Sequence, residues 1–279
     1  MNSIRAFERK ILRQNFTVLV NSSDGYVDCW QPFFRLFTLY WPDCNLKVLL
    51  NTETTSWSFP GLDLTCTQVG IAADKLTWSE CLIRALDQVR TPLVLYLQED
   101  YFLERSVDTR LVHELAELME ADARIKHVGL THFGSYGPFH PTSDSRLWRI
   151  NQKARYRIST QAGLWRTDTL RSYLKPEENG WMFELYGTRR ARKRKECFLT
   201  VNRESYCPSR IPIIQYIHTG IIKGKWHPEM PELFARHGIE VDFETRGFYK
   251  EEHWLLRKAG TLKKIASNPV AFFRGMAGF

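Results

Sequence analysis

The sequence lacks the motifs that identify several common classes of nucleotide-binding protein and hydrolase. It contains no G-x-x-x-x-G-K-[ST] phosphate loop and no G-x-G-x-x-G turn after its first apolar segment. It also has no G-x-S-x-G elbow and no H-E-x-x-H pair. A phosphate-binding function would therefore need another device, and a divalent cation held by one or two carboxylates is the simplest.

Long apolar runs and cysteine motifs are missing as well. No stretch approaches 18 consecutive apolar residues, and residues 1–16 lack the apolar core of a secretory signal. The cysteines show neither C-x-x-C nor Cys/His ligand spacing, so we expect reduced core thiols rather than disulfides or a zinc site. The six cysteines are Cys29, Cys44, Cys66, Cys81, Cys197 and Cys207. These absences predict a cytoplasmic protein.

The composition is that of a globular protein with an anionic partner. Hydrophobic residues make up 43% and charged residues 25% of 279 residues, which fits one large domain with an appendage. Aromatic residues reach 13%, with nine Trp, which favours surfaces for stacking. The net charge of +8 favours a nucleotide, a phosphorylated lipid, a membrane surface or a nucleic acid, without choosing among them.

The first half of the chain alternates predicted strands and helices. The strands are expected at 16–23, 46–53, 62–70 and 92–98, and the helices at 26–42 and 75–89. Helix 75–89 has an apolar face and a cap at Thr77 or Ser79, and Pro42 ends helix 26–42. Such alternation predicts an α/β fold, a mostly parallel sheet sandwiched by helices.

The second half is less regular. It predicts helices at 110–123 and 167–174, and strands at 127–133, 197–201 and 211–220. The tail 251–279 combines basic residues with Trp and Phe. A tail of this kind can lie in a membrane interface, here the inner face, or pack on the parent domain.

The strand at 92–98 ends on two adjacent carboxylates, Glu99 and Asp100. Side chains at the carboxyl end of such a strand project into the crevice where open α/β sheets bind ligands. The pair is either a solvated corner between strand and loop or the acidic corner that Mg²⁺ or Mn²⁺ needs.

Four stretches in order resemble a GT-A (Rossmann-like) glycosyltransferase of the family 2 type. They are VNSS (20–23), LLNTE (49–53), WSECLIRAL (78–86) and LYLQEDYF (95–102), and the resemblance spans about residues 16–226. These enzymes carry an Asp-X-Asp-type motif where this chain has Gln98-Glu99-Asp100. The resemblance implies that Asp100 is the metal-binding carboxylate. Gln98 stands where an acid is usual.

The resemblance extends to two further segments, one on the acceptor side and one that contains an acidic motif. STQAGLWRTDTL (159–170) resembles the acceptor-side segment of these enzymes. Glu184, in W-M-F-E, is similar to the catalytic base of inverting members, with Glu178 as the fallback. A carboxylate beside Trp181 and Phe183 would be partly desolvated, which raises its proton affinity. The alternative is an acid near a helix start, stabilised by the macrodipole.

The stretch YIHTGIIKGKW (216–226) resembles the C-terminal metal and diphosphate segment of the family. By this resemblance, His218 is a metal ligand, and imidazole with carboxylate favours Mn²⁺. Lys223, Lys225 and Trp226 would then form a lid over the diphosphate. The alternative for His218 is a hydrogen-bonded structural residue at the end of a strand.

The polar residues at the ends of the first two strands are expected to hold the nucleoside, and they are Asn21, Ser22, Asn51 and Glu53. Glu99 is expected to assist Asp100 at the metal. The run RRARKRK (189–195) is typical of a solvated helix face, although its place after Glu184 also suits an anionic acceptor or a lipid headgroup.

The resemblance implies an inverting, Mn²⁺- or Mg²⁺-dependent transfer of sugar from a nucleotide diphosphate sugar to a glycan or lipid-linked acceptor. Bacterial surface polysaccharide synthesis is the natural setting. The catalytic domain would be 1–250, with a donor half at about 16–104 and an acceptor half at about 105–250.

Two rival classes remain open. A sugar-phosphate nucleotidyltransferase should have a Gly-rich, Arg-containing loop after its first strand, which VNSSDGYVD is not. A non-catalytic protein that binds an anionic ligand or a nucleic acid would suit the charge, yet no RRM or KH signature is present, and we expect no nucleic-acid partner.

Overall fold

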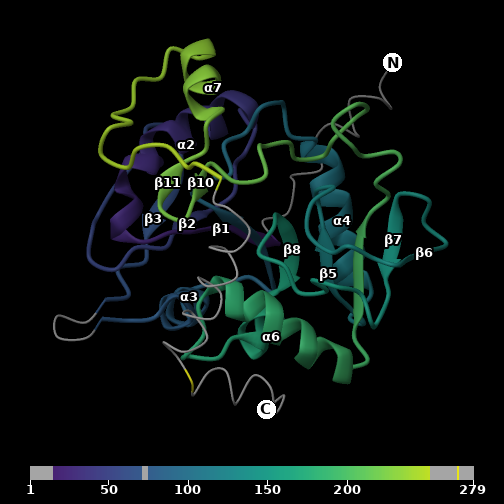
Figure 1. Cartoon of the computed structure of the whole chain (residues 1–279). Coiled ribbons are helices and arrows are strands. Elements are labelled where there is room, and N and C mark those ends of the chain that lie inside the picture. The colour runs from purple at the N-terminus through teal and green to yellow at the C-terminus, as the bar shows by residue number, and fades with distance from the viewer. Residues whose placement is uncertain (1–14, 71–74, 252–268, 270–279) are drawn as a thin grey trace.

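The structure, a computed structural model, describes residues 15–70, 75–251 and 269. Within them, one sheet has nine strands, and their bounds are β1 Phe16–Asn21, β2 Val48–Leu50, β3 Leu64–Cys66, β4 Leu93–Gln98, β5 Ile125–Gly129, β6 Phe139–Pro141, β7 Leu147–Ile150, β8 Gly163–Arg166 and β9 Cys197–Val201. Their order across the sheet is β3-β2-β1-β4-β8-β5-β9-β7-β6 (Figure 1).

The sheet is mixed but largely parallel. β1 pairs in parallel with both β2 and β4, and β2 pairs in parallel with β3. β8 is antiparallel to β4 and to β5, and β5 is parallel to β9. Only β7 and β8 therefore run against the other described strands of this sheet. The carboxyl ends of β1, β2 and β4 meet at one edge, as the sequence predicts.

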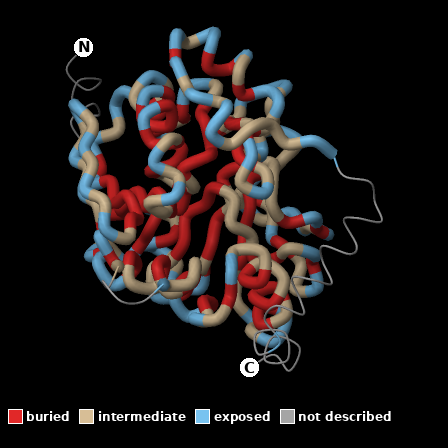
Figure 2. The backbone as a smooth tube through the Cα atoms, turned by 60° about the vertical axis from the view of Figure 1, so that its left-hand side comes forward, coloured by how far each residue is buried: buried red, intermediate tan, exposed pale blue. Residues whose placement is uncertain are grey.

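Helices cover both faces of the sheet. Their bounds are η1 Asp24–Tyr26, α2 Val27–Tyr40, α3 Trp78–Leu86, α4 Thr109–Ala121, α5 Thr167–Tyr173, α6 Gly180–Lys193 and α7 Met230–Arg236. Val18 and Val20 belong to a core cluster with α2, α4 and α7, whereas Leu19 belongs to a second cluster with α3, α5 and α6. Because neighbouring side chains of a strand point to opposite faces, β1 is buried on both sides. Figure 2 shows the buried backbone gathered in the middle of the molecule.

Side-chain caps begin α3 and α6, the two helices that contribute Trp78 and Glu184 to the cavities described below. The Thr77 hydroxyl accepts a bond from the Glu80 amide (3.1 Å), and the Thr77 amide donates to the Glu80 carboxylate (2.8 Å). This capping box begins α3 at the predicted cap. Asn179 caps α6 by accepting from the Met182 amide (3.0 Å).

The predicted strand at 211–220 is wrong. Its backbone bonds to the segment 100–108 consist of one isolated bridge, Leu103 with Tyr216, and a few loop hydrogen bonds. Ile213 and Ile214 are buried, so the apolar run reflects burial without a sheet partner. The strands β6 and β7 and the helix α7 are not predicted from the sequence, because elements of three, four and seven residues are too short to show a period.

A separate hairpin follows this segment. β10 Ile221–Ile222 pairs with β11 Lys225–Trp226. Lys223 and Gly224, between them, both have positive φ, 52° and 79°. Two such residues make the tight turn that matches the twist of a hairpin.

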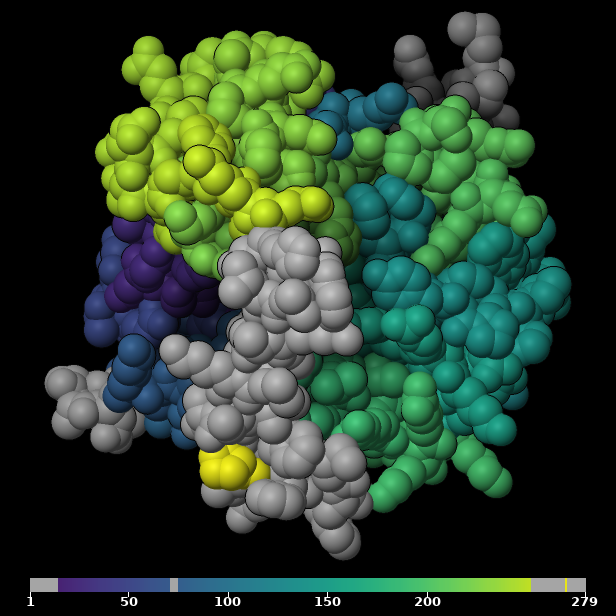
Figure 3. Space-filling view, in the orientation of Figure 1, coloured from purple at the N-terminus to yellow at the C-terminus, as the bar shows by residue number. Residues whose placement is uncertain are grey.

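The C-terminal part of the described chain returns to its beginning. Arg246 forms an ion pair with Asp28 and donates to the Gly25 carbonyl (2.6 Å). Figure 3 shows this yellow-green segment directly above the purple N-terminal part. Apart from residues 251 and 269, the predicted tail 251–279 lies outside the described residues. Among the helices described, none is long and apolar enough to cross a membrane.

Candidate functional site

Three adjoining cavities form a cleft at the carboxyl ends of β1 and β4. The first, here the acidic cavity, has a volume of about 250 Å³ and is lined by Glu99 and Asp100 with Gln98, Trp78, Tyr26 and Lys223. Asn21 and Ser22 line it from β1 and the residue after it. The acidic pair thus lies in the crevice, as the sequence predicts.

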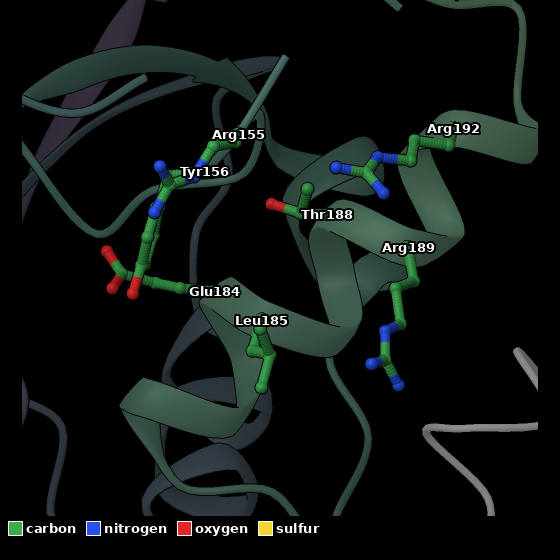
Figure 4. Close-up of a pocket in the computed structure, with 7 residues that line it drawn as sticks. All are labelled: Arg155, Tyr156, Glu184, Leu185, Thr188, Arg189 and Arg192. Atoms are coloured by element: carbon green, nitrogen blue, oxygen red, sulfur yellow. The ribbon is translucent and has the colours of Figure 1, made fainter. Parts of the chain in front are cut away.

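The second cavity, here the central cavity, holds Glu184 and His218 in about 300 Å³. It shares Gln98 and Thr219 with the acidic cavity. The third, here the arginine cavity, has about 260 Å³ and shares Tyr156 and Glu184 with the central one (Figure 4). Shared walls place the three side by side, with Glu184 between the acidic pair and the arginines.

The acidic pair is nearly buried. Glu99 is 8% and Asp100 is 7% exposed. Burial and the neighbouring Asp100 charge raise the pKa of Glu99 well above its ordinary value. Burial also raises the pKa of Asp100, although its carboxylate accepts bonds from the Thr219 hydroxyl and from the Ile221 amide (3.1 Å), which oppose that rise.

Two adjacent buried carboxylates fit a hard divalent cation. Their mutual repulsion and desolvation are relieved when a cation binds between them, and oxygen ligands suit Mg²⁺ or Mn²⁺. Among the described residues, no group of three or more His, Cys, Asp or Glu side chains could hold a metal. A site made of one or two carboxylates completed by substrate phosphates needs no such group.

His218 lies in the central cavity rather than among the residues that line the acidic one. Its ring packs 4.8 Å from the ring of Phe133. Burial and the nearby His227 lower its pKa, so the neutral imidazole is favoured. The neutral form is the one that ligates metals, and Thr219, next in sequence, bonds to Asp100.

Glu184 projects from the second turn of α6 into both the central and the arginine cavities. Its Oε1 accepts bonds from the Thr160 amide (2.7 Å), the Thr160 hydroxyl (2.9 Å) and the Ser159 hydroxyl (3.2 Å). Burial raises its pKa, in the direction that the sequence predicts, and these bonds oppose the rise. All three bonds end on Oε1, and no described residue bonds to Oε2.

Glu178, the fallback base, lies in a buried ion pair. Both of its oxygens accept bonds from Arg190, each at 2.6 Å. The two side chains are 3% and 5% exposed, and neither lines a cavity of the cleft. One arginine of the basic run is therefore internal, because it neutralises Glu178.

The residues expected to hold the nucleoside divide into two groups. Asn21 and Ser22 line the acidic cavity, but Ser22 also accepts a bond from the Trp30 indole (2.8 Å). Asn51 is fully buried and donates to Asn21 (2.9 Å). Glu53 accepts a bond from the Asp24 amide, which ties the loop after β2 to η1. Asn51 and Glu53 thus hold the ends of β1 and β2 and the loops after them in place. Neither is among the described residues that line the acidic cavity.

The predicted lid is only partly in place. Lys223, at the tip of the hairpin, lines the acidic cavity. Lys225 is exposed and does not line it. Trp226 is fully buried, with its ring 5.8 Å from that of Phe234. A lid position for Trp226 is therefore wrong, since alternation along β11 turns it into the core.

Aromatic residues of the cleft are the main feature that the sequence does not reveal. Tyr26 and Trp78 line the acidic cavity, where their rings could stack on a base. Tyr156 has a φ of 49°, which is rare for a bulky side chain and marks a constrained position. The high aromatic content is the only available signal, and it names no position.

Hydrogen bonds connect the acidic cavity to Glu184. The Tyr101 hydroxyl donates to Gln98 (2.7 Å) and to the Thr160 carbonyl (3.0 Å). Thr160 in turn holds Glu184. Gln98 therefore anchors a buried tyrosine between the two parts of the cleft.

Gly220 permits the close approach that orders Asp100. Its amide donates to the Asp100 carbonyl (2.9 Å), and an added Cβ would clash with the Phe102 ring and lie 2.9 Å from that carbonyl oxygen. We expect Gly220→Ala to lower the free energy of unfolding by about 1–3 kcal/mol, as overpacking does. Gly25→Ala, whose Cβ would meet only Ser23 at 3.7 Å, is the control. Equal midpoints in urea for both variants would contradict this account.

No protein-family model matches the chain, and no curated protein matches it in sequence. Among solved structures, it is similar to S. aureus TarS 1-349, with 14% identity, a TM-score of 0.46 and coverage of 67% of this chain and 57% of that one. It is also similar to S. aureus TarS 1-349 in complex with UDP-GlcNAc, with 13% identity and a TM-score of 0.42. That match covers 67% of this chain and 58% of the other.

A third similar structure is CMP:2-keto-3-deoxy-manno-octonic acid synthetase complexed with CTP, at 13% identity, a TM-score of 0.36 and coverage of 67% and 88%. All three similarities have low sequence identity and low TM-scores. The chain spans less than three-fifths of the two TarS structures. At these TM-scores the similarities assign no activity, so the side chains of the cleft must do so.

Proposed function

We propose that this protein transfers a sugar from a nucleotide diphosphate sugar to an acceptor hydroxyl, with inversion and with a divalent cation. The observation that carries the proposal is the shared wall of Gln98 and Thr219, on one side of which lies a buried acidic pair and on the other Glu184. A diphosphate leaving group and an acceptor hydroxyl need these two kinds of group within one sugar's reach.

The nucleotide would occupy the acidic cavity. Tyr26 and Trp78 offer faces for the base, and Lys223 offers a positive charge for the diphosphate. Asp100 and Glu99 would hold Mn²⁺ or Mg²⁺, which supplies neutralisation of the diphosphate's charge when bound. His218 remains a candidate for a further ligand.

Glu184 would act as the base. Its carboxylate takes the proton of the acceptor hydroxyl while that oxygen forms a bond to the anomeric carbon. The bond from the anomeric carbon to the diphosphate oxygen breaks, and its electron pair leaves with the nucleoside diphosphate. One direct displacement inverts the configuration at that carbon. The Ser159 and Thr160 donors hold the carboxylate in place and oppose the rise in its pKa that burial causes.

Donor binding tests the acidic cavity directly. We expect one series among UDP-, GDP-, CMP- and dTDP-sugars to raise the thermal midpoint, and only with Mn²⁺ or Mg²⁺ present. Asp100→Asn keeps an oxygen for the Thr219 and Ile221 donors but loses the charge, so its donor affinity should fall at least tenfold. Undiminished binding by this variant, or binding that chelator leaves unchanged, would contradict the cation site. Pyrophosphate release from a nucleoside triphosphate and a sugar phosphate would instead indicate a nucleotidyltransferase.

A further inference from the structure

The arginine cavity has no part in the reaction described above, yet it opens beside its base. Three arginines, Arg155, Arg189 and Arg192, line it together with Glu184. Figure 4 shows Glu184, Arg189 and Arg192 projecting from α6, with Arg155 and Tyr156, from the segment between β7 and β8, next to Glu184. Among the described residues, Arg155 and Arg192 against Glu184 alone already give this end of the cleft an excess of positive charge.

The spacing along α6 places the charges in line with the base. Glu184, Thr188 and Arg192 follow one another at intervals of four, so they share a face of the helix. At 1.5 Å per residue, Arg192 begins about 12 Å along the axis from Glu184. The long arginine side chain can span part of that distance. A ligand the size of a substituted sugar can therefore touch both ends.

Arg155 and Arg192 share the arginine cavity with Glu184. No other described carboxylate pairs with either of them. Arg192 is exposed and donates to the Lys153 carbonyl (3.5 Å). Arg155 is exposed too, with its guanidinium 5.9 Å from the Tyr136 ring centre. A guanidinium has five N–H donors, so these contacts leave most of them for a ligand. Its planar fork matches phosphate oxygens two at a time.

We propose that the acceptor carries a phosphate group, which Arg155 and Arg192 bind in the arginine cavity while the acceptor's hydroxyl lies at Glu184. This inference rests on the proposed function for the identity of the acceptor end of the cleft. The phosphate belongs either to a soluble phosphate ester or to a membrane lipid. A phosphate held here also keeps its negative charge away from the acidic pair, beyond Glu184.

Titration of the full chain with inorganic phosphate tests the site without any donor. By calorimetry, we expect the Arg155→Gln/Arg192→Gln variant to bind phosphate at least tenfold more weakly than the wild type. Arg124→Gln/Arg149→Gln is the matched control, because both side chains line a different basic cavity. It should bind as the wild type does. Since Arg155 and Arg192 are exposed, the substitutions should leave the thermal midpoint unchanged.

Vesicles distinguish the two sources of phosphate. Sedimentation with phosphatidylglycerol vesicles but not with phosphatidylcholine vesicles, lost in Arg155→Gln/Arg192→Gln, would assign the phosphate to a lipid. Arginine-dependent binding of inorganic phosphate without vesicle binding would assign it to a soluble ester. Phosphate and vesicle binding that are both unchanged in the variant overturn the proposal. Metal-dependent donor binding, measured separately, would still stand in that case, so the two failures are distinct.

Discussion

Glu184→Gln is expected to lower the turnover number for sugar transfer by about 10²–10⁴-fold, the usual worth of a positioned base. The amide oxygen can still accept the three bonds from Ser159 and Thr160, so the helix and the cleft should keep their geometry. It cannot take a proton. The measurement is the turnover number with saturating donor, alongside the donor dissociation constant, which should not change.

The pH profile adds a readout that a structural role would not move. A base works ionised, so turnover should rise with pH through the pKa of Glu184 and then level off. Because burial raises that pKa, the rising limb should lie above 4.5, the ordinary value. Ser159→Ala removes a donor that lowers the pKa, so its limb should move to higher pH.

The exposed Glu120→Gln on α4 is the control for charge and should retain the wild-type turnover. Unchanged turnover in Glu184→Gln, or the same rising limb in that variant, would remove Glu184 from the reaction.

Arg190→Met is expected to lower the free energy of unfolding by about 3–5 kcal/mol, because it leaves Glu178 buried without its counter-charge. Arg190 also donates to the Tyr173 carbonyl, at 2.6 Å. The Glu178 carbonyl accepts a hydrogen bond from the Ser79 amide, near the start of α3 (3.3 Å). The ion pair therefore holds the start of α3, with Trp78, against the helix that carries Glu184.

Urea unfolding measures this effect. Asp87→Asn, which breaks the exposed pair with Arg171, should cost no more than about 1 kcal/mol. Glu178→Leu/Arg190→Met should be more stable than Arg190→Met alone, since no buried charge is left unpaired. A loss in Arg190→Met no larger than that of Asp87→Asn would show that the buried pair is dispensable.

Local chemistry let the sequence predict most of the sheet's first half. β1 and β4 are continuous apolar runs, and a run of that length buried on both faces has few alternatives. The capping box at Thr77 and the end of α2 before Pro42 depend on neighbouring residues alone. The segment 211–220 fails because Ile213 and Ile214 are buried without a strand partner, and only distant contacts decide pairing.

Local sequence patterns were enough to predict the alternation of strands and helices and the position of Glu99 and Asp100 at the end of β4, since these follow from local periodicity and from where an apolar run stops. Tertiary packing, by contrast, selects which acid lies in the cleft. Glu178 and Glu184 stand six residues apart, yet packing pairs the first with Arg190 and opens the second to the cleft. It also turned Trp226 into the core and gathered Arg155 with Arg192 beside Glu184. Such choices depend on burial and on contacts between distant segments, which no local pattern encodes.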